Sequence, residues 1–355
     1  MAYTTIDDPS AYFQIALYTG TGSEIVVTND GNSDLKPDIL WAKNRDDTDN
    51  HHLHNTSIVN PPTRGENTNT TDFEQSEAQS FTAVATDGFT VGTWDQINTN
   101  TQRFVVWQWA VNNATKTTFA ESGNNPGGTY QVNTTAGVSI CMYTGTGAAG
   151  GVTHGLGVAP KFIMIKNRDV TDPWAVYYGD ATDYLVLNDT AATVDNAAWW
   201  NDTAPSSTVF TVNTDHSVNA DGELYIAYAF AEVQGYSKFS TYVGNGNVDG
   251  PFVYLGFKPA WLMIKATSAS GGDSWQMVDN KRDPFNKDSG AYHKLGANSN
   301  SYESASTAIG GDLVSNGFKV RATDSGWNTI GRTYTYYAFA ENPFVTSTGI
   351  PATAR

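Results

Sequence analysis

The order of apolar runs and turns along this chain repeats three times. Each copy opens with a tyrosine and a glycine turn, passes through a proline into an apolar run ending in lysine, and closes with an aromatic run. The opening turns are Tyr18-Thr-Gly-Thr-Gly22, Tyr143-Thr-Gly-Thr-Gly147 and Tyr242-Val-Gly-Asn-Gly246. The lysine runs end at Lys43, Lys166 and Lys265. Shorter runs follow at Asp87–Val91, Thr208–Val212 and Asn316–Val320, and the closing runs are Phe104–Trp109, Tyr225–Phe230 and Tyr334–Phe339. Four landmarks in one order indicate one unit used three times.

The spacing of the copies indicates whole domains. Tyr143 and Tyr242 lie 99 residues apart, whereas solenoid repeats have periods of roughly 20–50 residues. A chain of 355 residues is long enough for three domains that each bury a core.

Within a copy the pattern is typical of short strands. Phe162-Ile-Met-Ile165 is a continuous apolar run between turn residues, which favours a strand buried on both faces over a helix. Trp174–Tyr178 and Tyr184–Leu187 predict a pair of strands. We therefore expect an all-β protein with three tandem β-sandwich or jelly-roll-like domains related by the internal repeat.

The landmarks and the composition between them predict the domain boundaries. Glu232–Tyr236 is a short joint, which predicts a rigid second and third repeat beside a first repeat that can pivot. The stretch before the second repeat is rich in Thr, Asn and Gly, as linkers often are. The expected parts are an N-terminal arm (1–12), repeat 1 (13–112), a linker (113–137), repeat 2 (138–233), repeat 3 (236–344) and a C-terminal tail (345–355).

Composition narrows the range of partners. Only 16% of residues are charged, and the formal net charge is −16. Such a surface repels phosphate backbones and anionic bilayers, so we expect neither nucleic-acid binding nor membrane insertion. No apolar stretch approaches the roughly 18–20 residues of a spanning helix, and the first residues lack a secretion-signal pattern. Cys141 is the only cysteine, which excludes an internal disulfide and favours synthesis in a reducing cytoplasm.

Few residues suggest metal binding or catalysis. His52 and His54 would share one face of a strand and, with His51, could supply metal ligands, but a solvated loop is the favoured reading. Asp215–Glu223 resembles a calcium loop, yet it lacks the EF-hand register, and a turn closed by Asp221-Gly222 is favoured. Neither a Gly-x-Ser-x-Gly elbow nor a recognisable carboxylate pair is found. We expect no enzyme activity, no cofactor and no resident metal.

Two sets of recurring or unusual residues have structural interpretations. Lys43, Lys166 and Lys265 are expected to lie along a sheet edge with their ammonium groups in solvent. Four tryptophans occur in polar loop contexts, where packing under a loop, a subunit interface and glycan stacking all remain open. These tryptophans are Trp94, Trp199, Trp200 and Trp327.

Several long motifs resemble tail-fibre-like virion proteins of marine bacteriophages. The similar stretches are the opening Met1–Phe13 with its Tyr-Thr-Gly-Thr-Gly turn, His154–Arg168, Phe230–Phe239 and Tyr337–Phe344. The resemblance covers almost the whole chain and is strongest from Val138 to Phe344. The first repeat departs from it around His51 and at Asn60-Pro-Pro-Thr63.

The resemblance implies a non-enzymatic structural protein of a bacteriophage virion, made in the host cytoplasm. It would be a tail-fibre, tail-associated or surface-exposed adhesion protein that contributes to host attachment. Analogy with fibres predicts a homotrimer joined to other virion proteins through the arm 1–12. The alternatives are a lectin-like carbohydrate-binding module, a capsid decoration or head-fibre protein and, less favoured, a polysaccharide depolymerase.

Loops after the lysine runs differ most among the copies, and variable loops on a rigid scaffold commonly carry binding residues. The third loop contains Gly271-Gly-Asp-Ser-Trp275 and Asn298-Ser-Asn-Ser-Tyr302, with Trp327 further on. We expect Trp275, Tyr302 and Trp327 to contact the host surface or a host glycan.

Overall fold

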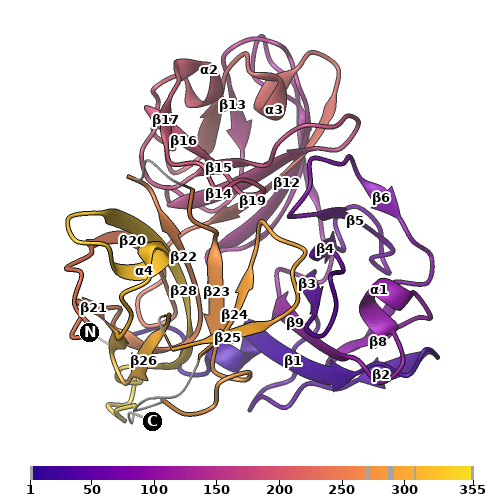
Figure 1. The fold of residues 1–355 in the computed structure, drawn as a ribbon. Helices are drawn as coiled ribbons and strands as arrows, with labels where there is room; N and C mark the ends of the chain where they lie inside the picture. The colour runs from indigo at the N-terminus through magenta and orange to yellow at the C-terminus, as the bar shows by residue number, and fades with distance from the viewer. Residues whose placement is uncertain (1–2, 269–271, 287–291, 308, 353–355) are drawn as a thin grey trace.

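The structure, a computed structural model, describes residues 3–268, 272–286, 292–307 and 309–352, and it is all-β with several sheets. Figure 1 shows three β-rich lobes around a common centre. We call the lobes modules: module 1 contains β1–β9, module 2 contains β10–β19 and module 3 contains β20–β28. Each module has one large sheet and one small sheet.

The elements are as follows. Module 1 has η1 (Pro9–Ala11) before it and contains β1 (Phe13–Thr19), β2 (Ile25–Val27), β3 (Ile39–Asn44), β4 (His52–Asn55), β5 (Arg64–Asn67), β6 (Gln75–Ser76), β7 (Phe81–Val84), β8 (Phe89–Val91), α1 (Asp95–Asn98) and β9 (Arg103–Trp109). Module 2 contains β10 (Thr117–Phe119), β11 (Gly128–Asn133), β12 (Val138–Thr144), β13 (Gly150–Thr153), β14 (Phe162–Asn167), β15 (Ala175–Tyr177), β16 (Asp183–Val186), β17 (Val194–Asp195), α2 (Ala197–Trp200), β18 (Val209–Val212), α3 (His216–Asn219) and β19 (Leu224–Phe230). Module 3 contains β20 (Ser237–Val243), β21 (Phe252–Tyr254), β22 (Phe257–Ala266), β23 (Gln276–Asp279), β24 (Tyr292–Gly296), β25 (Ser304–Ser306), β26 (Gly311–Val314), β27 (Gly317–Val320), α4 (Ser325–Asn328) and β28 (Thr333–Pro343).

The three large sheets share one strand order. It is β1-β9-β3-β4-β5-β6 in module 1 and β20-β28-β22-β23-β24-β25 in module 3. Module 2 has the corresponding order β12-β19-β14-β15-β16-β17, with β11 and then β10 added beside β12. The small sheets are β2-β8-β7, β13-β18 and β21-β27-β26. The recurring sequence landmarks therefore correspond to recurring strands.

Each large sheet buries both faces. In module 1, Leu40 and Val106 face a local core shared with the small sheet, while Trp41 and Trp107 face a core common to all modules. This double burial explains why β3 and the corresponding β14 are continuous apolar runs. The prediction of a fully buried strand at Phe162–Ile165 is confirmed.

One aromatic residue from each module meets at the common centre. Trp109, Phe230 and Phe339 lie at matching registers of β9, β19 and β28, opposite Phe13, Val138 and Ser237. Their ring centroids lie 5.5–6.2 Å apart in all three pairs. The modules thus surround a pseudo-threefold axis, and module 1 shares this core instead of forming a repeat free to pivot.

The recurring Tyr-x-Gly-x-Gly turn follows β1, β12 and β20, and in every module it packs against a one-turn helix. The tyrosine hydroxyls donate to backbone carbonyls of these helices: Tyr18 to Ile97 at 2.6 Å, Tyr143 to Val218 at 2.6 Å and Tyr242 to Trp327 at 2.7 Å. A Cβ on the first glycine, Gly20, would lie 2.2 Å from the Thr99 carbonyl oxygen, and the second, Gly22, has φ +67°. Close approach and a positive φ explain both glycines.

The segment expected to be a linker, 113–137, differs from that expectation. It contains β10 and β11, which form a hairpin, and β11 pairs with β12 from Gly128 opposite Tyr143 to Asn133 opposite Val138. Unpaired strand edges favour the addition of another strand. The Thr- and Asn-rich composition of the segment therefore belongs to a sheet extension.

The N-terminal arm packs against module 3. The Tyr3 hydroxyl donates to the Gly256 carbonyl at 2.8 Å, and Ile6 is buried in the common core. The Ser347 N–H of the tail donates to Asp7 at 2.6 Å. Residues 1–2 and 353–355 of these two predicted parts lie outside the described residues. No helix in the described part of the chain has the length and apolar character needed to cross a membrane.

Candidate functional site

The contacts between neighbouring modules, which we call seams, are equivalent around the axis. A backbone N–H from one module donates to a backbone carbonyl of the next module. The accepting residue directly follows β3, β14 or β22. These bonds run from Glu303 to Arg45 (2.8 Å), from Glu74 to Arg168 (3.2 Å) and from Thr193 to Thr267 (3.1 Å). They link module 3 to 1, 1 to 2 and 2 to 3, so the ring closes within one chain.

In each module the residue that directly precedes β4, β15 or β23 points into a seam. Trp174 Nε1 donates to the Asn67 carbonyl of module 1, and Trp275 Nε1 donates to the Val186 carbonyl of module 2, both at 2.9 Å. His51 holds the corresponding place in module 1, and its Nδ1 accepts from Trp41 Nε1 at 3.1 Å. We call His51, Trp174 and Trp275 the seam residues.

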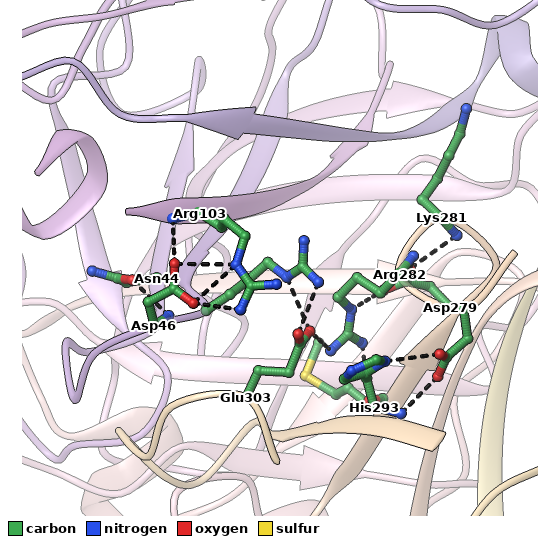
Figure 2. Close-up of polar contacts among 11 residues, drawn as sticks. Asn44, Asp46, Arg103, Asp279, Lys281, Arg282, His293 and Glu303 are labelled. Carbon is green, nitrogen blue, oxygen red and sulfur yellow. Dashed lines mark hydrogen bonds and ion pairs between the residues drawn. The ribbon is translucent and has the colours of Figure 1, made fainter. Parts of the chain in front are cut away.

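The seam between modules 3 and 1 contains a buried charge network (Figure 2). Glu303 accepts from Arg45 Nη2 at 2.8 Å and from Arg282 Nη1 at 3.3 Å. Arg282 Nε also donates to Asp279 at 2.6 Å, and its guanidinium lies 5.5 Å from the Trp107 ring centroid. The side chains of Arg282 and Asp279 are fully buried, and that of Glu303 is 2% exposed. The charges compensate one another, so the network locks two modules together.

The three recurring lysines are buried, so the prediction of solvated ammonium groups is wrong. Lys43 Nζ donates to the carbonyls of Asn44 and Asp47 at 2.6 and 3.0 Å. Lys166 and Lys265 make the same bond to the residue that follows them, at 2.9 and 3.0 Å. Burial lowers the pKa of each lysine to about 8. Backbone carbonyls at the ends of the strands take the place of water around the ammonium groups.

The histidine cluster is part of the core of module 1. His52 and His54 share one face of β4, as the pattern predicts, but both are buried instead of lying in a solvated loop. Burial lowers the pKa of His52 to about 3 and that of His54 to about 4. His52 packs 4.5 Å from the Trp94 ring, and His54 Nδ1 lies 2.8 Å from the Pro62 carbonyl. Within the described ranges, no group of three or more His, Cys, Asp or Glu is placed to hold a metal ion.

Of the three predicted contact residues, only Tyr302 is at the surface. Trp275 and Trp327 are fully buried, so the prediction that they contact the host is wrong. Trp275 is a seam residue. Trp327 is the third residue of α4, the position that Ile97 holds in α1. Tyr302 is 58% exposed and borders a hollow of about 160 Å³. Gly271 of the same predicted loop lies outside the described residues.

The other polar-loop tryptophans are also packed. Trp199 and Trp200 are buried in the local core of module 2, which selects the packing interpretation for both. Trp94 is partly buried against the local core of module 1. The Asp215–Glu223 stretch forms α3, where Asp215 caps the helix by accepting from the Ser217 N–H at 2.9 Å, followed by a turn with Gly222 at φ +77°.

Two open clefts occur at corresponding places beside the first strands of modules 1 and 3. One, of about 510 Å³, lies between β1 and module 3 and is crossed by the Lys281–Asp30 ion pair at 2.7 Å. The other, of about 580 Å³, lies between β20 and module 2. Its ionisable lining comprises Lys161, Tyr178, Asp180, Asp183 and Glu232. The clefts lie at seams between modules, which the sequence does not predict.

In the third seam the hairpin covers the corresponding place. Gln131 of β11 is fully buried, accepts from the Ser57 hydroxyl at 2.5 Å and lies 3.4 Å from the Thr56 hydroxyl. Lys116 of the same hairpin donates to the Ser57 carbonyl. The recurring pattern in the sequence could have located this seam, because Ser57 follows His51 by the same interval as Asp180 follows Trp174.

The fold defines a class of protein in which three matching pairs of sheets close around one core within a single chain. The chain belongs to the family described as a domain of unknown function (DUF7483), whose model matches residues 8–343. That match includes all three modules, so the family unit is the whole ring. The chain has no significant match among curated proteins or among solved structures.

Proposed function

We propose that this chain is a non-enzymatic structural protein of a bacteriophage virion, acting in a tail fibre, a tail-associated complex or a surface-exposed adhesion device. The main structural support is the shared core of Trp109, Phe230 and Phe339, which turns three repeats into one block suited to carrying load. The resemblance to tail-fibre-like virion proteins supports the same conclusion. The modules are proposed to be three jelly-roll-like sandwiches that arose by duplication.

The recurring residues support this proposal because they maintain the fold. Tyr18 and its counterparts attach a turn to a helix, and Lys43 and its counterparts satisfy backbone carbonyls at strand ends. Host contact is then left to residues that differ among the copies. Tyr302, exposed and outside these shared motifs, is the candidate contact that we retain.

The location of the chain can be tested on purified virions. We expect mass spectrometry to detect the chain and a virion density map to place its three-lobed block on the tail or capsid surface. A chain confined to the infected-cell lysate and absent from virions would contradict the proposal. Density at the capsid would favour the decoration or head-fibre alternative.

Attachment can be tested with a matched pair of variants. Virions with Tyr302→Ala are expected to assemble normally and adsorb about tenfold more slowly, because hot-spot aromatic residues carry much of the energy of an interface. Ile330→Ala, another exposed apolar residue of module 3, is the control. Equal adsorption of both variants would remove Tyr302 from the proposal.

A lectin-like function is the second candidate. The hollow beside Tyr302 is lined by Ser274, Gln276, Ser299 and Ser301, which place hydroxyl and amide groups next to an exposed ring. This combination suits a sugar ring. Binding of a host polysaccharide that is lost with Tyr302→Ala, in a protein absent from virions, would favour this candidate.

Assembly is proposed to be homotrimeric, with other virion proteins attached near the N-terminal arm. Ile6 of the arm is buried, so deletion of residues 1–12 would destabilise the fold as well as remove an anchor. Tyr3→Ala is the milder test of the arm. Glu24→Ala, which changes an exposed side chain outside the arm, is the control. Analytical ultracentrifugation is expected to give a trimer, and a stable monomer at micromolar concentration would contradict it.

A further inference from the structure

Strands β1, β12 and β20 hold the same place in the strand order of the three large sheets, but among the described residues only β12 has a further strand beside it. Strands β1 and β20 are end strands of their large sheets, whereas β12 has β11 beside it. At matching positions of these strands, Cys141 is buried and Met142 is half-buried, while Ser240 and Thr241 of β20 are exposed. The chain therefore contains both a covered and an uncovered form of one edge.

The hairpin shows how a strand is held at the covered edge. Two neighbouring residues of β11, Tyr130 and Gln131, point to opposite faces, as side chains in a strand do. The Tyr130 ring packs on Gly155, so closely that a Cβ on this glycine would lie 2.2 Å from the ring. Gln131 enters the seam and bonds to Ser57. An aromatic side chain on one face and a polar side chain in the seam thus fix this strand.

The residues in the position of Ser57 differ in charge among the modules. They are Ser57, Asp180 and Lys281, each six residues after its seam residue. Ser57 is bonded to Gln131, and Lys281 to Asp30 of the neighbouring module. Among the described residues, the hydrogen bonds of Asp180 stay within its own turn, from the N–H and hydroxyl of Thr182 at 3.0 and 2.9 Å. Of these three residues, Asp180 alone has no hydrogen bond across its seam within the part of the chain that the structure describes.

The cleft at this position is acidic and lies directly beside β20. Asp180, Asp183 and Glu232 line it together with Lys161. Asp183 accepts from the Tyr178 hydroxyl at 3.3 Å, and Glu232 accepts from the Phe239 N–H at 3.0 Å. Three carboxylates and one ammonium leave a net negative charge, which favours a cationic side chain where the covered seam has Gln131.

The other face of the β20 edge presents an aromatic surface. Tyr254 of β21 is 48% exposed, and Lys238 of β20 places its Nζ 5.4 Å from the Tyr254 ring centroid. Gly256 follows β21 by the same two residues as Gly155 follows β13. Tyr254 and Gly256 therefore occupy the surface that Tyr130 covers in module 2. The hydroxyl of Tyr3 in the N-terminal arm contacts both residues, donating to the Gly256 carbonyl at 2.8 Å and lying 3.1 Å from the Tyr254 hydroxyl. The exposed part of the Tyr254 ring is therefore the part of this surface that a further side chain can reach.

We propose that the open edge of β20 is a docking site for an extended strand of a partner protein. The strand would pair antiparallel with β20, place a lysine or arginine among Asp180, Asp183 and Glu232, and pack an apolar or aromatic side chain on Tyr254. Backbone pairing supplies affinity in this mode of recognition, and alternate side chains supply specificity. The occupant is thus a basic and aromatic β-strand, of which β11 is the internal counterpart.

A synthetic peptide of residues 115–133 that carries Gln131→Lys is the probe, and the full chain is the target. We expect fluorescence anisotropy to show binding at least about tenfold tighter than that of the same peptide with Gln131→Glu, with the difference shrinking at high salt. Hydrogen exchange should slow in residues 237–243. Equal binding of both peptides, or protection at β1 instead, would overturn the proposal.

Two variants of the full chain complete the test. Asp180→Lys should remove most of the preference between the two peptides, because the lining of the cleft then carries two carboxylates and two ammonium groups. Thr241→Pro should abolish binding, while Thr241→Ala should retain it. The Phe239 N–H points away from β28, because it donates to Glu232, and the N–H of every second residue of a strand points the same way. The Thr241 N–H is therefore on the outer edge, and proline would remove it. An unchanged melting temperature would show that each variant is folded. A folded Asp180→Lys variant with the peptide preference of the wild type, or a folded Thr241→Pro variant that still binds, would overturn the proposal. So would self-association of the chain through β20 that the peptide cannot displace.

Discussion

The seam between modules 3 and 1 and the seam between modules 2 and 3 have the same backbone contact and different side chains. The first pairs Glu303 with Arg45 and Arg282, whereas the second brings the Thr193 hydroxyl to the Thr267 carbonyl at 3.2 Å. The backbone bonds and the common core therefore determine the geometry of the ring. The side chains determine how much the free energy of unfolding falls when a seam is mutated.

The largest effect is expected at the charged seam. Glu303→Ala leaves the buried guanidinium of Arg282 with one carboxylate and Arg45 with none of its Glu303 bonds. Breaking a buried ion pair on one side costs about 3–5 kcal/mol. We expect a loss of that size in the free energy of unfolding, measured by urea denaturation. A loss under about 1 kcal/mol would show that the network contributes little.

The seam between modules 1 and 2 should show a pH effect. Burial raises the pKa of Glu66, whose Oε2 lies 3.5 Å from the Tyr228 hydroxyl of module 2, to about 8. Because this value is above the ordinary value of about 4.5, the contribution of Glu66 to stability falls as pH rises from 4.5 to 8. Glu66→Gln should remove this fall and exceed wild type at pH 8.5 by at least about 1 kcal/mol.

Urea denaturation from pH 5 to pH 8.5 measures this difference. Glu74→Gln, at the same seam and paired with Arg168, is the matched control and should be less stable than wild type throughout. A Glu66→Gln variant whose stability follows wild type at every pH would contradict the pKa assignment.

The recurring lysines should produce the opposite trend at higher pH. Their folded pKa values of about 8 lie below the ordinary 10.5, so the folded state binds fewer protons than the unfolded state between these values. Stability should therefore rise from pH 8 towards pH 10, and Lys265→Met should reduce that rise by about a third. A stability that falls steadily across this interval in wild type would contradict the result.

The smallest effect is expected at a single hydroxyl bond of the seam between modules 2 and 3. Thr193→Ala removes one hydroxyl bond to the Thr267 carbonyl and leaves the backbone bond between the same residues in place. A hydrogen bond contributes about 0.5–1.5 kcal/mol, so the loss should stay near the lower end. Losses equal to that of Glu303→Ala would contradict the contrast between the seams.

The sequence predicted the strands and the repeat well because both depend on local pattern. Phe162–Ile165 and the pair formed by Ala175–Tyr177 and Asp183–Val186 are visible as apolar runs between turns. The turn at Gly20 and Gly22 is also a local signal.

The closure of the ring was not predicted, because it depends on contacts between residues far apart in the chain. Trp275 and Trp327 appear in polar loops and were interpreted as surface residues, yet one fills a seam and the other belongs to the common core. Comparison with Trp174 and Ile97 at the same places of the other copies would have indicated burial. The linker interpretation failed similarly, since only pairing with β12 reveals β11 as a strand.

The central claim is that the three modules share one core and unfold as a unit, which differential scanning calorimetry tests directly. A closed ring should melt in one transition whose calorimetric enthalpy equals the van't Hoff enthalpy. Glu303→Ala at one seam and Trp174→Ala at another should both move this single transition. Separate transitions, or a variant in one module that leaves the melting of another unchanged, would contradict the shared core.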